Sequence, residues 1–84
     1  MSRLLRHPVE LWVKKDSKGE PVAFSYNGKL ENVRRIWKRW RVSADWWREE
    51  VIREYFQIET NSSVICDIYH DLLRKRWFLQ RIYD

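Results

Sequence analysis

Cysteine, glycine and proline are scarce in this sequence, and no long apolar run occurs in it. The 84 residues include a single cysteine, Cys66, together with two glycines and two prolines. One cysteine excludes a framework of disulfide bonds within the chain and is typical of a reducing compartment. No apolar stretch approaches the roughly 20 residues of a membrane-spanning helix, and the opening MSRLLRHP is too short and too charged for a secretory signal. We therefore expect a cytoplasmic protein with no membrane partner.

Aromatic and basic residues are the abundant ones. Trp, Tyr and Phe make up 15% of the residues, and the formal net charge is +5. Each buried aromatic side chain removes roughly 150–250 Å² from water, which compensates for a chain that is short for building a core. We expect residues 1–84 to form a single small domain. The positive charge favours an anionic partner, such as nucleic acid or an acidic protein, and says nothing about the fold.

The first third of the chain predicts a β-meander. Residues 1–8 are expected to form a loose N-terminal arm. In VELWVKK, Leu11 and Val13 alternate with Trp12 and Lys14, as in a half-buried strand. The following segments predict a turn (DSKGEP), a second strand (VAFSY) and a hairpin turn at the Asn-Gly dipeptide.

The stretch WRVSADWWREEVIREYF, residues 40–56, fits two structures. As a helix, with Ser43 as the N-cap, it would carry an apolar stripe that includes Tyr55. As sheet, Trp46 and Trp47 would mark the turn between two strands. Periodicity alone leaves both structures open. Further along, VICDIY and RWFLQRIYD alternate as strands do.

Residues 33–84 carry a set of short motifs in a fixed order. They are the Trp pair at 46–47, REYFQIET at 53–60, IYHD at 68–71 and the final RWFLQRIYD. In these motifs the sequence resembles the small C-terminal domain of ImuB-type proteins, the catalytically inactive Y-family DNA polymerase homologues of bacterial mutagenesis systems, and related small free-standing bacterial proteins. The resemblance implies a mainly β domain with the Trp pair near a turn. This sequence has no polymerase body, so the implied role beside translesion polymerases is indirect.

With this resemblance, strands are favoured over the helix. We expect a mainly β fold, a small antiparallel sheet or half-open barrel of about five or six strands with one short helix at most. The alternative is an α+β fold in which residues 44–58 are helical.

The segment RRIWKRWR, residues 34–41, is the best candidate for function, because basic and aromatic residues interleave there without an acid. With Trp40 directed into the core, strand geometry would leave Trp37 outside among arginines. Proteins that bind single-stranded nucleic acid use such aromatic planes for base stacking and cations for the phosphates. The alternative is that both tryptophans pack in the core or against the N-terminal arm. The arginines would then form an ordinary row of ion pairs with the acids just downstream, Glu49, Glu50, Glu54 and Glu59. We expect single-stranded or distorted DNA to bind through Arg35, Trp37, Lys38, Arg39 and Arg41.

A second function class is a protein–protein adaptor. Exposed tryptophan is enriched at interaction hot spots, and one residue of an adjacent Trp pair must point away from the core of a sheet. In this alternative, Trp46, Trp47 and Tyr55 form an apolar patch that docks on a polymerase or mutasome subunit. A free sheet edge would also allow a homodimer to form by strand pairing.

Catalysis and metal binding have little support. Cys66 and His70 would lie about 13 Å apart on a strand, at ~3.3 Å per residue, which is too far for a thiol–imidazole hydrogen bond. One cysteine and two histidines, His7 and His70, match no zinc spacing, and the two glycines form no phosphate loop. We expect a binding module with no enzymatic activity, cofactor or metal.

Overall fold

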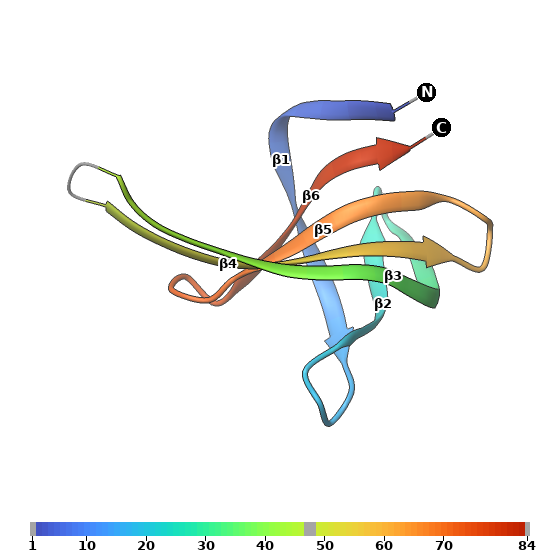
Figure 1. Ribbon diagram of the computed structural model, residues 1–84. Helices are drawn as coiled ribbons and strands as arrows, with labels where there is room; N and C mark the ends of the chain where they lie inside the picture. Colours follow the sequence, from blue (N-terminus) through green and yellow to red (C-terminus); the bar gives the residue numbers. More distant parts are fainter. Residues whose placement is uncertain (1, 47–48, 84) are drawn as a thin grey trace.

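Six antiparallel strands form a closed ring of backbone hydrogen bonds in the computed structural model of the protein (Figure 1). The structure describes residues 2–46 and 49–83, with side chains for residues 4–45 and 50–83. Each strand pairs with its neighbour in sequence, and the first pairs with the last. The strands are β1 (Ser2–Lys15), β2 (Pro21–Tyr26), β3 (Lys29–Trp46), β4 (Glu49–Thr60), β5 (Ile65–Asp71) and β6 (Arg76–Tyr83).

Strand β1 closes the ring. Its first part pairs with β6, at Ser2–Leu4 and Val9–Leu11, and its last part pairs with β2. The prediction of a loose arm at residues 1–8 is therefore wrong from Ser2 onward, because these residues belong to β1. A register shift between Leu4 and Val9 accommodates Pro8, whose nitrogen cannot donate to a ladder. Because β1 reaches both neighbours, the ring is closed and not half open.

The two tight connections near the N-terminus follow their sequence signals. Asn27 and Gly28 both have positive φ, 53° and 72°, as a two-residue hairpin turn requires. Between β1 and β2, Gly19 has φ 82°, and the Asp16 carboxylate accepts the amide hydrogens of Lys18 and Glu20, both at 2.9 Å. These turns place β1, β2 and β3 as the predicted meander.

Strands β3 and β4 form a long hairpin that projects from the ring, so the ring is not an even barrel (Figure 1). Their register runs from Val33 opposite Thr60 to Trp46 opposite Glu49. The helix considered for residues 44–58 is wrong, because residues 49–60 are paired with β3 and then with β5. No helix occurs in the described residues, and hence none that is long and apolar enough to cross a membrane.

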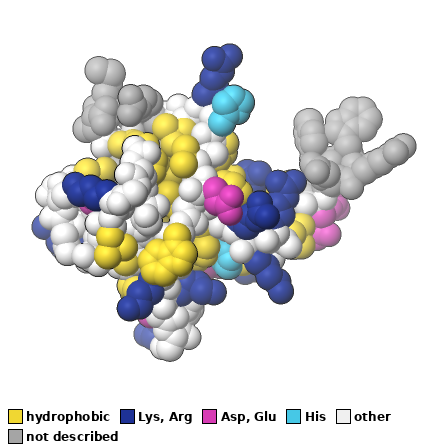
Figure 2. Space-filling model, turned by 180° about the vertical axis from the view of Figure 1, so that it is seen from behind, with side chains coloured by type: hydrophobic (Ala, Val, Ile, Leu, Met, Phe, Trp, Pro, Cys, Tyr) yellow, Lys and Arg dark blue, Asp and Glu magenta, His cyan; other side chains and the backbone are white. Residues whose placement is uncertain are grey.

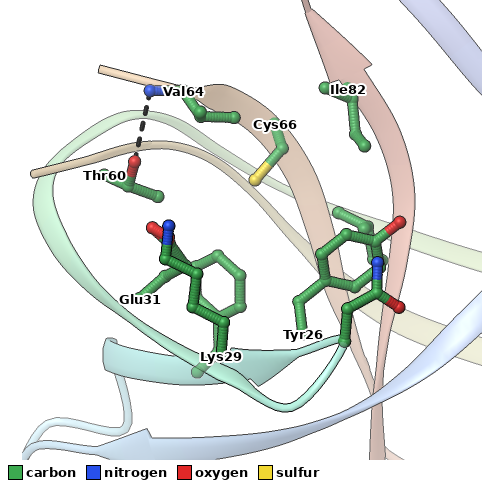
Figure 3. A pocket seen from close by; sticks show the side chains of 10 residues that line it. Tyr26, Lys29, Glu31, Thr60, Val64, Cys66 and Ile82 are labelled. Carbon is green, nitrogen blue, oxygen red and sulfur yellow. Dashed lines mark hydrogen bonds and ion pairs between the residues drawn. The ribbon is translucent and has the colours of Figure 1, made fainter. Parts of the chain in front are cut away.

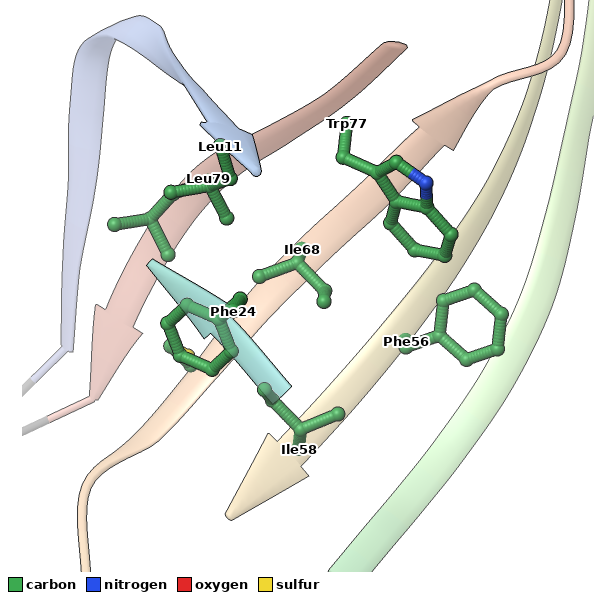
Figure 4. Packing of buried hydrophobic residues seen from close by; sticks show 8 residues of the cluster. Leu11, Phe24, Phe56, Ile58, Ile68, Trp77 and Leu79 are labelled. Carbon is green, nitrogen blue, oxygen red and sulfur yellow. The ribbon is translucent and has the colours of Figure 1, made fainter. Parts of the chain in front are cut away.

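Alternate residues of the strands fill the ring (Figure 4). Phe56 and Ile58 of β4 and Ile68 of β5 are fully buried. This is the period-two burial that the alternating sequence predicts. The mainly β, antiparallel prediction is therefore confirmed. The buried cluster comprises Leu11, Phe24, Phe56, Ile58, Cys66, Ile68, Trp77 and Leu79.

Candidate nucleic-acid interface

The predicted DNA-binding segment of β3 does not present a single face. Its register with β4 shifts twice, between Val33 and Arg35 and between Ile36 and Lys38, and each such bulge reverses the alternation of side chains. As a result, Arg35 lies opposite Glu59, whereas Arg39 lies opposite the core residue Phe56. The face predicted to hold Arg35, Trp37, Arg39 and Arg41 is split between the two sides of the sheet.

Three of the four arginines of this segment, Arg34, Arg39 and Arg41, form ion pairs with acids. Arg39 contacts Glu20 at 3.3 Å and Glu54 at 3.0 Å, and Arg41 contacts the second oxygen of Glu54 at 3.4 Å. Arg34 pairs with Glu59. Figure 2 shows basic side chains beside acidic ones near the root of the projecting hairpin. These contacts are the ion-pair row weighed as the alternative, and they reduce the positive charge offered to a phosphate.

Trp37 is half-exposed but held in place. Its indole N–H donates to Glu59 at 3.0 Å, and the Arg35 guanidinium lies over its ring at 4.7 Å. The hydrogen bonds from Trp37 and Arg34 lower the pKa of the Glu59 carboxyl, so this acid stays charged. One ring face of Trp37 is therefore already occupied by a cation.

Trp40, expected in the core, lies on the outer side of the sheet and is 38% exposed. It stacks on Tyr55 with centroids 5.2 Å apart and planes within 8°. Tyr55 continues the row to Tyr69 at 5.0 Å, and Tyr69 to Phe78 at 5.2 Å. The bulge after Ile36 explains the difference, because it moves every later residue of β3 to the other side.

The predicted protein-docking patch is only partly described. Tyr55 is 7% exposed and lies beneath Trp40, so it serves the aromatic row and offers almost no surface. Trp47 lies outside the described residues, as does the side chain of Trp46. The backbone of β3 ends at Trp46 and that of β4 begins at Glu49.

Of the predicted cations, Lys38 and Arg35 form no ion pair among the described residues, and Arg35 lies over Trp37. Lys38 lies opposite Gln57 on the outer side of the sheet. A shallow hollow of about 610 Å³ extends from Lys38 and Trp40 to Arg81 on β6. The one carboxylate lining it, Asp67, accepts the Tyr83 hydroxyl at 2.7 Å. This hollow offers one exposed aromatic ring and two cations.

A stronger combination of cations and aromatic rings occurs at one open end of the ring. We call this surface the basic-aromatic end and define it by the basic and aromatic side chains that line a hollow of about 590 Å³. Trp12 is its most prominent member, 61% exposed. The defining residues are Trp12, Lys15, His70, Lys75, Arg76 and Trp77.

Strand pairing and one tight turn assemble the basic-aromatic end. Leu11 of β1 is opposite Trp77 of β6, which brings the next residue of each strand, Trp12 and Arg76, together on the outer side. In the turn between β5 and β6, the Asp71 carboxylate accepts two backbone amides, and Lys75 adopts a positive φ of 58°. The turn thereby places Lys75 next to the strand ends.

Inside this end, His70 and Trp77 form a parallel stack. Their ring centroids are 4.4 Å apart and their planes differ by 2°. Burial and the positive charge of Lys15 lower the pKa of His70, so its imidazole is neutral at pH 7. The only acid among the lining residues, Glu10, contacts Arg76 at 3.8 Å. The surface thus combines an exposed indole with cations that outnumber the acid.

Comparison with known proteins places the chain in a family. All of it, residues 1–84, matches the family model described as Domain of unknown function (DUF6504). The chain belongs to the DUF6504 family. No curated protein and no solved structure matches it.

Two further groups of this DUF6504 chain bear on chemistry. Burial raises the pKa of the Cys66 thiol to about 12, so it stays protonated and is a poor nucleophile. Among the described residues, no three His, Cys, Asp or Glu side chains gather in a way that could hold a metal ion.

Sequence reasoning missed the basic-aromatic end, although part of its signal was present. The alternation in VELWVKK already placed Trp12 on the side away from Leu11, where an exposed tryptophan is unusual. The sequence did not indicate which residues lie next to Trp12. Its proximity to Lys75 and Arg76 follows from the pairing of β1 with β6, across more than sixty residues of chain.

Proposed function

We propose that this protein is a non-catalytic module that binds single-stranded DNA through the basic-aromatic end. The observation that carries the proposal is the exposed Trp12 beside Lys15, Lys75 and Arg76, with Glu10 as the only acid in the lining. This is the function class expected from the sequence, but the proposed contact surface is the basic-aromatic end and not β3.

Proteins that bind single strands use aromatic rings to stack the bases and cations to bind the phosphates. A base stacked on an aromatic ring contributes roughly 1–3 kcal/mol, and flanking cations hold the backbone. Trp12 offers the ring, whereas Trp37 is bound to Glu59 and lies under Arg35. The resemblance of residues 33–84 to the C-terminal domain of ImuB-type proteins favours DNA over RNA and a translesion-synthesis context.

Fluorescence anisotropy with a labelled single-stranded oligonucleotide, measured at several salt concentrations, tests the proposal. Trp12→Ala should weaken binding roughly 5- to 150-fold, which corresponds to the loss of about 1–3 kcal/mol of stacking. Lys75→Gln with Arg76→Gln should reduce the slope of log K against log salt by about 1.4, since each lost phosphate contact removes about 0.7. Trp37→Ala is the matched control and should leave the affinity nearly unchanged.

Two results would overturn this assignment. Absence of binding at low salt, despite the charge of +5, would exclude the nucleic-acid function. Binding lost with Trp37→Ala but kept with Trp12→Ala would return the contact surface to β3.

The projecting β3–β4 hairpin favours one other function, a protein–protein adaptor. Beyond the ring, its described β3 residues are exposed on both sides, including the apolar Val42 and Ala44. A polymerase or mutasome subunit is the partner class in this alternative. Replacing residues 43–50 by Asn-Gly should abolish co-purification with such a subunit and leave DNA binding at the other surface intact.

A further inference from the structure

The opposite end of the ring holds a second cavity, of about 370 Å³ (Figure 3). It lies between the β2–β3 turn, the β4–β5 connection and the end of β6. Phe24, Cys66 and Leu79, all members of the buried core, line its inner part. Val64 and Ile82 complete the wall. We call this cavity the apolar mouth.

Two polar groups in the wall of the apolar mouth, Thr60 and Glu31, already have hydrogen-bond partners within the protein. The Thr60 hydroxyl shares a hydrogen bond of 3.0 Å with Ser62 and accepts the Val64 amide at 3.2 Å. The Glu31 carboxylate accepts the Ser62 hydroxyl at 2.9 Å. The wall therefore presents mainly carbon and sulfur to the cavity, and a ligand there would find few hydrogen-bonding groups.

Charge at the rim is balanced. Lys29 and Glu31 are the ionic side chains of the lining, and they face each other at 3.9 Å. An anionic head group would be attracted by Lys29 but repelled by Glu31. A cationic head group would be attracted by Glu31 but repelled by Lys29. The Tyr26 hydroxyl makes no hydrogen bond among the described residues, so it can serve one polar atom of a ligand at the opening.

We propose that the apolar mouth binds a small, uncharged, mainly apolar molecule that carries one hydroxyl group, with its carbon chain against Cys66, Leu79 and Ile82. A cavity of about 370 Å³ falls in the size range of small-molecule sites, which occur in the mouths of β-barrels. The hydroxyl of such a ligand would lie at the opening beside Tyr26. This site shares no residue with the basic-aromatic end and stands without the DNA proposal.

Titration of the protein with 1-octanol, followed by NMR of the side-chain methyl groups, tests this site. Saturable shifts confined to Val64, Leu79 and Ile82 are expected. Octanoate and octylamine, which carry a charge on the same chain, should bind more weakly by tenfold or more. A uniform, non-saturating shift with 1-octanol would contradict the proposal, and equal binding of either charged compound would contradict the uncharged ligand.

A pair of variants distinguishes binding in the cavity from non-specific binding to the protein surface. Val64→Trp fills the opening and should abolish octanol binding. Val22→Trp is the matched control, because Val22 and Val64 are almost equally exposed, 37% and 39%, and Val22 does not line the cavity. Octanol binding that survives Val64→Trp would overturn the assignment. So would a protein dimer that Val64→Trp disrupts, since a second copy would then be the occupant.

Discussion

The two ends of the ring are built by the same strands and differ in chemistry. Strand β5 contributes Cys66 to the apolar mouth and His70 to the basic-aromatic end, and β6 contributes Ile82 and Trp77 in the same way. These inner strand residues supply buried or apolar groups to both ends. The difference arises at the strand ends and connections: residues 61–63 at one end are uncharged, whereas the other end carries Lys75 from the β5–β6 turn and Lys15 and Arg76 from the adjoining ends of β1 and β6.

This comparison shows where a small closed sheet can vary. Replacing an inner strand residue disturbs both ends, because the core between them is continuous. Replacing a turn residue changes one end alone. Mutations in the turns can therefore change one end of the ring without loss of the fold. Mutations in the shared core should have the larger effect.

The largest effect is expected from the shared core. Ile68→Ala removes a fully buried side chain between the two ends and should lower the free energy of unfolding by about 2–5 kcal/mol. Urea denaturation followed by tryptophan fluorescence measures it. Leu73→Ala, in the exposed β5–β6 turn, should change stability by less than about 0.5 kcal/mol. A similar loss in both variants would contradict the assigned core.

A smaller effect is expected at the ion pairs of β3. Glu54→Gln removes the acid that Arg39 and Arg41 share. If these ion pairs weaken the attraction of β3 for phosphates, the variant should bind single-stranded DNA several-fold more tightly and with a steeper salt dependence. Anisotropy measures both quantities. Unchanged affinity and slope would show that the Glu54 charge does not control DNA binding.

The smallest effect is expected from the pH dependence of His70. Its pKa is lowered in the folded protein by burial and by Lys15, so the unfolded chain binds more protons as pH falls below about 6.5. This contribution to stability is complete above that pH and is lost progressively below it. Thermal melts between pH 5 and pH 7.5 measure the change, which His70→Gln should reduce. An NMR titration that gives His70 an ordinary or raised pKa would contradict this prediction.

Much of the fold was predictable because its signals are local. Asn27-Gly28 determines a hairpin turn, and alternation in VELWVKK and VICDIY determines strands with defined inner sides. The two bulges in β3 were not predictable, because nothing in RRIWKRWR distinguishes an even strand from one with an extra residue. They move Trp40 from the expected core to the outer side and divide the predicted DNA face.

For the candidate site, too, the residue types were predictable from the sequence and the position was not. Composition and charge favoured a basic, aromatic contact surface, and the surface proposed at the end of the ring is of that kind. The proposed position differs from the predicted one because Glu54 and Glu59 of β4 pair with Arg34, Arg39 and Arg41 of β3, and that pairing depends on register. Of the predicted cationic site residues, Lys38 and Arg35 form no ion pair in the described part of the chain.

The sequence by itself determined an all-β domain with a net positive charge and a core of alternating apolar residues. These properties depend on composition and on period two, which a single strand already contains. Only the tertiary structure decided the closure by β1, the neighbours of Trp12 and the contrast between the two ends. These features require residues far apart in the chain to meet, and strand pairing, not local pattern, selects which of them do.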